Sequence, residues 1–329
     1  MIVKEAYRIW QNDYWRIEGN LLENTIRGYI SIYNKHLLPI IGDCQIDNID
    51  VQKLQEYYNS LANQGVKSKT IKNINQALEA MLRYFQQKKE ISDIQVDTIV
   101  LPKLRGNNEI ANPISEEEYV KLLPYLSGHY KWVVPFIAET GIRVEEIAIP
   151  LTCIDFENKL IHIQYAVKRK YTNFENKTTK LICSPYLKAE ASYRTVPITP
   201  TVEIIINNQL QHLKNNNINS EFLFPNTNGE IIEPRNLLRY YHELLDKANL
   251  EHRGLSSLRK LFIKRMVLGG MQPKVLQKIV GHSEFSTTMK YYMIIDDNDK
   301  KQEALKVYEN LRNSSINAYY DQLLCSTDS

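Results

Sequence analysis

The sequence is poor in several features that would place it in particular protein classes. Its 329 residues include only four cysteines, far apart at Cys44, Cys153, Cys183 and Cys325. That spacing offers neither a disulfide framework nor a zinc knuckle, so we interpret them as reduced thiols of an intracellular protein. No apolar run approaches the roughly 20 residues of a membrane span. The N-terminal stretch MIVKEAYRIWQNDYW lacks the layout of a signal peptide, and we expect a cytoplasmic protein.

A large excess of one charge sign is also missing. The 41 Lys and Arg residues against 38 Asp and Glu give a net charge of +3. The distribution is less even, because eight basic residues and a single acid fall between Arg253 and Lys290, and seven basic residues and two acids between Lys168 and Arg194. Local positive patches attract polyanions such as DNA. They can equally be solvated faces that acids elsewhere in the fold balance.

The hydrophobic pattern divides the chain into two predicted domains, which its length also favours. Residues 1–90 show only helical spacing, and residues 91–113 carry the prolines, glycine and asparagines of a linker. Residues 114–315 combine helices with strand-like alternation, with turns at Glu157-Asn158 and near Lys188. Residues 316–329 form a tail. We therefore predict a mainly α protein of the α+β class, with a small antiparallel β-sheet in its second domain.

Particular residues mark the ends of the predicted helices. Pro39 and Gly42 should end the helix that contains IRGYISIYNKHLL, and Asp50 should cap the next one. Ser115 and Glu118 have the spacing of a capping box at the start of the second domain.

Basic side chains also gather where a helix is predicted to begin at Ser68. A helix N-terminus with lysines suits a phosphate, although ordinary surface charge explains the lysines equally well. Together with the two basic segments, this region gives six candidate DNA contacts: Lys67, Lys69, Lys72, Lys168, Arg169 and Lys260.

Four segments of the second domain carry side chains suited to phosphodiester chemistry. Arg143 in TGIRVEEI and Arg259 in LSSLRKLF lie among apolar residues, where an arginine needs an anionic partner, either an acid inside the fold or a phosphate. Lys188 precedes the strand-like RTVPIT, and GHSEFSTTMKYY places His282 nine residues before Tyr291. Two guanidinium groups can stabilise a pentavalent phosphate, a tyrosine hydroxyl can attack it, and a lysine can protonate the leaving oxygen. Such a set needs no metal.

The segments TGIRVEEI, SSLRKLF and GHSEFSTTMKYY, in this order, resemble the three signature boxes of the tyrosine recombinases, or phage integrases. Each box alone is weak, but three in order with a lysine between the first two are specific. The resemblance covers nearly the whole chain. Residues 1–90 resemble the helical, SAM-like core-binding domain of that family, and residues 114–315 resemble its catalytic domain.

The resemblance implies a role for individual residues of the boxes. Tyr291, which follows the Thr-Thr pair, would be the nucleophile rather than Tyr292, and His282 would hydrogen-bond the scissile phosphate. Arg143 and Arg259 fall on the two arginine positions of the family.

The resemblance also implies a general acid and a supporting carboxylate. Lys188, in LKAEASYRTVP, falls on the family's hairpin lysine and would protonate the leaving oxygen. Lys180 and Lys177 are alternatives, because the loop is long. Glu146 falls on the acidic position that supports the first arginine.

One position departs from the family pattern. The second box usually begins with histidine three residues before its arginine, and here that residue is Ser256. Serine can donate a hydrogen bond to phosphate but cannot titrate near neutral pH. Lys260 or His252 could compensate. Met293, where many relatives have histidine, matters less.

The resemblance implies a two-domain DNA clamp and a site-specific recombinase, the integrase or excisionase of a mobile element. It would cut and rejoin double-stranded DNA through a 3′-phosphotyrosine and a Holliday junction, without a nucleotide cofactor. The resemblance also implies a homo-tetramer on two DNA sites, a dimer per site, with the segment beyond Lys301 docked on a neighbouring protomer. An accessory directionality factor is compatible with this reading. The resemblance implies that the core-binding domain begins almost at residue 1 and that the arm-binding domain of many relatives is missing, either in a natural short form or through truncation of the chain.

Three alternatives stay open at the level of the sequence. A resolvase or inverter of the chromosome-dimer type would use the same chemistry. A catalytically inactive DNA-binding protein of the same fold is favoured by Ser256 and opposed by the otherwise intact set of residues. A helical scaffold without any nucleic-acid role is opposed by the basic run that starts at Arg253.

Overall fold

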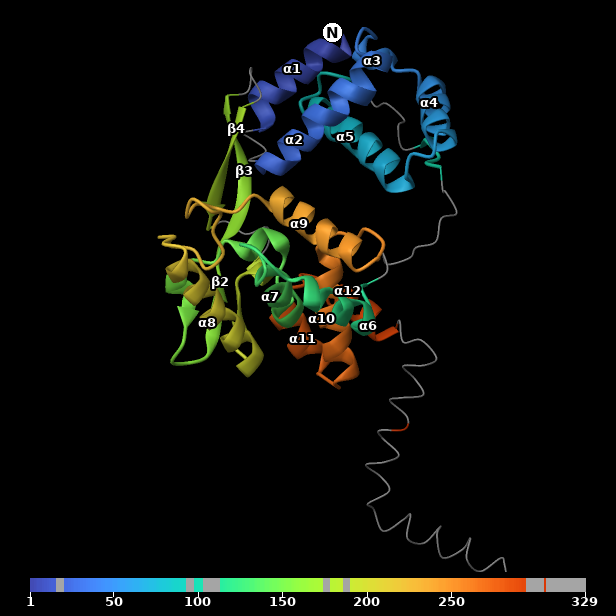
Figure 1. Ribbon diagram of the computed structural model, residues 1–329. Helices are drawn as coiled ribbons and strands as arrows, with labels where there is room; N and C mark the ends of the chain where they lie inside the picture. The colour runs from blue at the N-terminus through green and yellow to red at the C-terminus, as the bar shows by residue number, and fades with distance from the viewer. Residues whose placement is uncertain are drawn as a thin grey trace, which may run out of the picture. The chain divides into compact units, whose positions relative to one another are not determined.

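The computed structural model describes residues 1–15, 21–92, 98–102, 113–173, 178–185, 190–293 and 305 (Figure 1). These residues are mainly helical with small antiparallel sheets, so the predicted fold class is confirmed. They divide into a first unit, residues 1–108 with 169–179, and a second unit, residues 109–168 with 180–329. Each unit has its own hydrophobic core. No helix among the described residues is both long and apolar enough to cross a membrane.

The first unit is built from five helices within the part of the chain that the structure describes. They are α1 (Val3–Asp13), α2 (Glu23–Ile32), α3 (Leu38–Ile41), α4 (Val51–Asn63) and α5 (Ser68–Gln87). Aromatic side chains fill much of its core, where Tyr33 is fully buried and donates a hydrogen bond to the Ala77 carbonyl over 3.0 Å. Asp50 caps α4 as predicted, because its carboxylate accepts from the backbone N–H of Gln52 (2.9 Å) and of Lys53 (3.1 Å).

Pro39 does not end its helix, contrary to the prediction. The chain continues from α2 through a π-helical turn, Tyr33–Leu37, into α3, and stops at Ile41 with Gly42 as the C-cap. A proline lacks the N–H that a helix interior requires. Here it occupies the first turn of α3, directly after the wider π-helical turn, and the helical path therefore tolerates it.

The second unit holds seven helices within the described residues. They are α6 (Glu116–Leu122), α7 (Val133–Thr140), α8 (Pro200–Asn215), α9 (Pro234–Lys247), α10 (Ser256–Leu268), α11 (Pro273–Val280) and α12 (Phe285–Met293). The predicted capping box opens α6, with Glu118 N–H donating to Ser115 Oγ (3.1 Å) and Ser115 N–H donating to a Glu118 carboxylate oxygen (2.8 Å).

The strands of the second unit pair differently from what the predicted turn near Lys188 implies. Strands β1 (Ile154–Asp155), β2 (Leu160–Ile163) and β5 (Arg194–Pro197) form an antiparallel sheet in that order. Strands β3 (Ala166–Asn173) and β4 (Thr178–Ser184) pair separately. The strand after Lys188 therefore does not form a hairpin with the strand before it, because β5 pairs with β2 and buries Val196 opposite Ile161. This register also places Arg194 at the N-terminal end of β5, opposite Ile163.

Candidate active site

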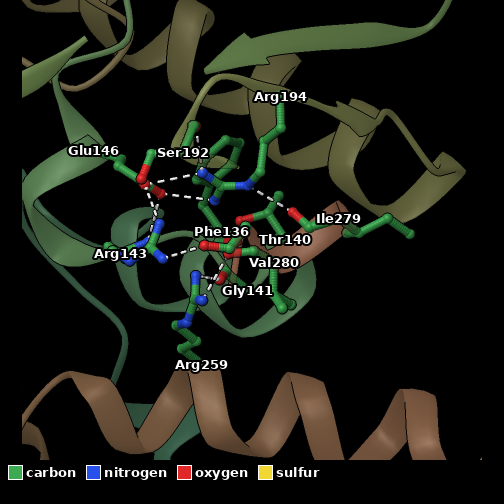
Figure 2. Close-up of polar contacts among 11 residues, drawn as sticks. Phe136, Thr140, Gly141, Arg143, Glu146, Ser192, Arg194, Arg259, Ile279 and Val280 are labelled. Carbon is green, nitrogen blue, oxygen red and sulfur yellow. Dashed lines mark hydrogen bonds and ion pairs between the residues drawn. The ribbon is translucent and has the colours of Figure 1, made fainter. Parts of the chain in front are cut away.

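The C-terminal end of α11 collects three arginine side chains. The last carbonyl groups of a helix have no partner within it, and they form the negative end of the helix dipole. Here three consecutive carbonyls each accept a hydrogen bond from a guanidinium group (Figure 2). The bonds run from Arg194 Nε to Ile279 (2.6 Å), from Arg259 Nη2 to Val280 (2.6 Å) and from Arg143 Nη2 to Gly281.

Two glycines leave space for side chains in and around this arginine cluster. Gly281 ends α11 with φ +68°, and a Cβ there would lie 2.8 Å from the Ala191 carbonyl oxygen and 2.9 Å from Arg194 Cδ. Gly141 ends α7 with φ +62°, and a Cβ there would lie 2.2 Å from the Phe262 ring. Both positions therefore require glycine, for backbone conformation and for space.

Glu146 joins two of the arginines from inside the protein. Its side chain is 3% exposed, and its carboxylate accepts two bonds from the buried Arg194 (2.9 and 2.7 Å) and one from Arg143 Nη1 (2.7 Å). Burial acts to raise the pKa of this carboxyl, but the hydrogen bonds and charges of Arg194 and Arg143 lower it below its ordinary value. Three guanidinium groups around one carboxylate leave these four side chains with an excess of positive charge.

Among the three arginines, Arg259 is the one that does not contact the Glu146 carboxylate. It is 8% exposed, and its guanidinium donates to the carbonyls of Gly141 (2.7 Å) and Val280 (2.6 Å) and to no acid among the described residues. Burial, followed by the charge of Arg143, lowers the pKa of Arg259 to about 9. A buried cation with only neutral partners gains energy from an anion, so this group is suited to bind a phosphate oxygen.

His282 and Tyr291 lie beside the arginines. The backbone N–H of His282 donates to the Gln277 carbonyl (3.2 Å), and its Nδ1 lies 2.9 Å from Thr288 Oγ1. Its ring centre is 6.2 Å from that of Tyr291, with 17° between the planes. Burial and the charges of the three arginines lower the pKa of His282 to about 4, so its imidazole is neutral near pH 7.

The two neighbouring tyrosines of α12 have different surroundings. The Tyr292 hydroxyl donates a hydrogen bond to the Met271 carbonyl. The Tyr291 hydroxyl has no such bond among the described residues. Burial raises the pKa of Tyr291, while the charge of Arg259 acts to lower it. The arrangement leaves the Tyr291 hydroxyl available for a substrate.

The remaining predicted catalytic residues are placed less centrally. Ser256 is the first residue of α10, one turn before Arg259, and is exposed. Lys180 is exposed on β4. Lys177 and Lys188 lie outside the described residues, as does the segment beyond Lys301 except for residue 305. The role of Lys188 stays a prediction.

Part of the basic run from Arg253 is neutralised inside the fold. Arg253 pairs with Glu118 (2.6 Å), and Arg265 pairs with Glu116 (2.7 Å) and Glu139 (2.6 Å). These acids come from α6 and α7, more than a hundred residues earlier in the chain. Two of the eight basic residues are thus paired with acids inside the fold. For these two, the alternative that distant acids balance the basic run is correct.

The six candidate DNA contacts occupy varied places. Lys67, Lys69 and Lys72 are exposed around the start of α5. Arg169 on β3 donates to Thr179 Oγ1 over 3.0 Å. Lys168 on β3 and Lys260 on α10 are half-buried, and this burial lowers the pKa of both lysines. Their contacts with DNA stay a prediction.

The chain matches two family models. The first, described as the phage integrase family, covers residues 112–298, and the second, a phage integrase N-terminal SAM-like domain, covers residues 3–62. The chain belongs to the phage integrase family. The expected resemblance to the tyrosine recombinases, or phage integrases, is thereby confirmed.

Curated relatives and solved structures agree with this assignment. The chain is 27% identical over 262 residues to a tyrosine recombinase XerC-like protein of Caldanaerobacter subterraneus subsp. tengcongensis, covering 73% of the chain and 66% of the relative. It is 25% identical over 285 residues to the transposase of transposon Tn916 from Enterococcus faecalis, covering 78% of the chain and 67% of the relative. The chain thus spans about two thirds of these relatives. The Tn1549 transposon integrase in complex with transposon right end DNA has the same fold, with a TM-score of 0.71, 22% identity, and coverage of 94% and 100%.

Two polar residues of this integrase-family site were not predicted from the sequence. In the sequence, Arg194 looks like an ordinary charged residue of a short strand. The sequence offered one clue, which is that a buried Glu146 paired with Arg143 alone would need a second partner. Thr288 belongs to a Thr-Thr pair that could have been an ordinary helix surface. Its burial becomes visible only when α12 is packed, since Thr287 is exposed and Thr288 is fully buried.

The low pKa of His282 predicts a specific pH dependence of stability. The imidazole titrates at about 4 in the folded protein against an ordinary value of 6.5, so between these values the unfolded chain binds a proton that the folded chain does not. The free energy of unfolding should therefore fall as the pH falls through this window. Urea unfolding of wild type and of His282→Asn across the window measures the effect. The variant should show a shallower dependence, and equal slopes would contradict the assigned pKa.

Proposed function

We propose that this protein is a site-specific DNA recombinase that integrates or excises a mobile element through a covalent phosphotyrosine intermediate. The observation that carries the proposal is the arrangement at the end of α11. Arg143, Arg259 and His282 are gathered there, and the ring of Tyr291 lies beside His282. Cationic donors with an excess of positive charge, next to a tyrosine hydroxyl that has no hydrogen-bond partner among the described residues, are suited to transesterification of a phosphodiester.

In the proposed reaction the guanidinium groups of Arg143 and Arg259 bind the non-bridging oxygens of the scissile phosphate. They stabilise the extra negative charge of the pentavalent transition state. As the Tyr291 oxygen attacks phosphorus, its hydroxyl proton passes to solvent, a 3′-phosphotyrosine bond forms, and the bond to the 5′-oxygen breaks. Lys188 supplies the proton for that oxygen. The 5′-hydroxyl of a partner strand then reverses the step, which requires two DNA sites and, in our proposal, four protomers.

A nicked duplex that carries the element end tests this function directly. After cleavage the short strand diffuses away and the covalent intermediate accumulates, so a protein–DNA band should survive a denaturing gel. A wild-type protein that binds the same duplex tightly without forming this band would instead be an inactive DNA-binding protein of the family.

Ser256 offers a prediction about the rate of this reaction. It stands where the family's second box usually has histidine, on the same face of α10 as Arg259. Ser256→His should accelerate formation of the covalent band, because general acid–base help is worth about 10²–10⁴-fold and an added group recovers at least part of it. Single-turnover cleavage measures the rate, with Ser256→Asn as the control that cannot titrate. An unchanged rate in Ser256→His would indicate that another group, such as Lys260, already performs this role.

A further inference from the structure

A fully buried hydroxyl group faces the imidazole of His282. Thr288 is 0% exposed in α12, and its Oγ1 lies 2.9 Å from His282 Nδ1. The structure gives this hydroxyl no other hydrogen-bond partner among the residues it describes. The neighbouring Thr287 is exposed on the same helix. Within the described residues, Thr288 is thus a polar side chain with a single hydrogen-bond partner.

The burial of Thr288 decides the direction of this hydrogen bond. A buried O–H that donates to nothing costs about 1–3 kcal/mol. Since water does not reach Thr288 and the imidazole nitrogen is the one acceptor within range among the described residues, the hydroxyl must donate and Nδ1 must accept. A neutral imidazole carries one proton, so that proton resides on Nε2.

We propose that Thr288 is a positioning residue that holds His282 as the Nε2–H tautomer, ready to donate a hydrogen bond to the scissile phosphate. This inference rests on the proposed function. With the opposite tautomer, Nε2 would present a lone pair to an anion and repel it. The low pKa of His282 makes the distinction necessary, because a doubly protonated ring that donates from both nitrogens does not form near pH 7.

The position of Thr288 links this tautomer to the nucleophile. Thr288 and Tyr291 are three residues apart on α12 and lie on neighbouring positions of one face. The helix that carries the attacking hydroxyl therefore also carries the donor that sets the proton of His282. When α12 occupies this position, it places the Tyr291 hydroxyl and fixes the tautomer of His282 at the same time.

The tautomer can be observed in the wild-type protein without DNA. Histidine labelled with ¹⁵N gives two-bond proton–nitrogen correlations that distinguish Nδ1–H, Nε2–H and the imidazolium, and His282→Gln identifies the relevant signals. Near pH 7 we expect His282 to be a single Nε2–H tautomer. An Nδ1–H tautomer, or a mixture of the two, would overturn the proposal whatever the protein does to DNA.

Three variants then test whether the tautomer matters for the reaction. Thr288→Val keeps the shape but removes the donor, so it should mix the tautomers of His282 and slow covalent-band formation. We expect a loss of about 10- to 100-fold, by analogy with removal of the orienting partner of a metal-bound histidine. Thr288→Ser keeps the donor and should retain both the tautomer and most of the rate. Thr287→Val, the matched control on the exposed face, should change neither.

The outcomes separate this inference from the proposed function. A slow Thr288→Val variant that still shows a pure Nε2–H tautomer would overturn the role of the tautomer, and so would a mixed tautomer with a wild-type rate. Absence of the covalent band in the wild type would refute the proposed function while the spectra still report on His282. Circular dichroism and thermal unfolding of Thr288→Val establish that it folds, and Thr288→Ser carries the test if it does not.

Discussion

Tyr291→Phe should abolish the covalent protein–DNA band, whereas Tyr292→Phe should leave it close to the wild-type level. Adjacent residues of a helix point about 100° apart, and only Tyr291 lies beside His282. The hydroxyl of Tyr292 is already bound to the Met271 carbonyl, so it anchors α12 to the turn before α11. Phenylalanine has no nucleophilic oxygen, and the loss at position 291 should therefore be complete.

The nicked-duplex assay on a denaturing gel measures this effect, with DNA binding measured in parallel. Both variants should bind the duplex as the wild type does. Tyr292→Phe loses one hydrogen bond, which costs about 0.5–1.5 kcal/mol of stability and is not expected to prevent the reaction. A band that persists in Tyr291→Phe and disappears in Tyr292→Phe would shift the nucleophile by one residue and refute the register assigned to the third box.

The parts of the fold that the sequence predicted are those that depend on near neighbours. The capping box at Ser115 and the cap at Asp50 are contacts between residues two or three apart, and both are present. The two failures have different causes. Pro39 is tolerated because a π-helical turn directly precedes it, and the sequence pattern did not indicate that turn. Strand β5 pairs with β2, more than 30 residues earlier in the chain, because the buried side chains match across the sheet, which no local pattern reveals.

The candidate site divides in the same way. Arg143 and Arg259 could be nominated from the sequence because a guanidinium group within apolar sequence requires an anion, whatever its neighbours are. Arg194 could not be nominated in this way. Its contacts depend on the register of β5 and on the end of α11, where Ile279 lies 85 residues later in the chain. The roles assigned to the boxes rest on family resemblance, and the structure adds the contacts through which those residues are held.

Arg194→Met should be the most destabilising single substitution in this site. The side chain of Arg194 is 4% exposed and makes two hydrogen bonds to Glu146, one to the Ile279 carbonyl and one to the Ser192 carbonyl. Methionine fills similar space but leaves the Glu146 carboxylate buried with Arg143 alone, and Arg143 is 33% exposed. Breaking one side of a buried ion pair costs about 3–5 kcal/mol. Urea unfolding near pH 7 should show a loss of that order.

The pH dependence and a double variant identify the cause of that loss. In the wild type the pKa of Glu146 is lowered, so this carboxylate contributes stability above its ordinary pKa and loses it as the pH falls. Without Arg194, burial dominates and raises the pKa of the Glu146 carboxyl. Acidification should therefore reduce the difference in the free energy of unfolding between Arg194→Met and wild type. Adding Glu146→Gln removes the buried charge and should restore part of the stability near pH 7. If the double variant is no more stable than Arg194→Met, the uncompensated carboxylate is not the cause of the loss. The lost hydrogen bond from Arg194 to the Ile279 carbonyl of α11 would then be the cause.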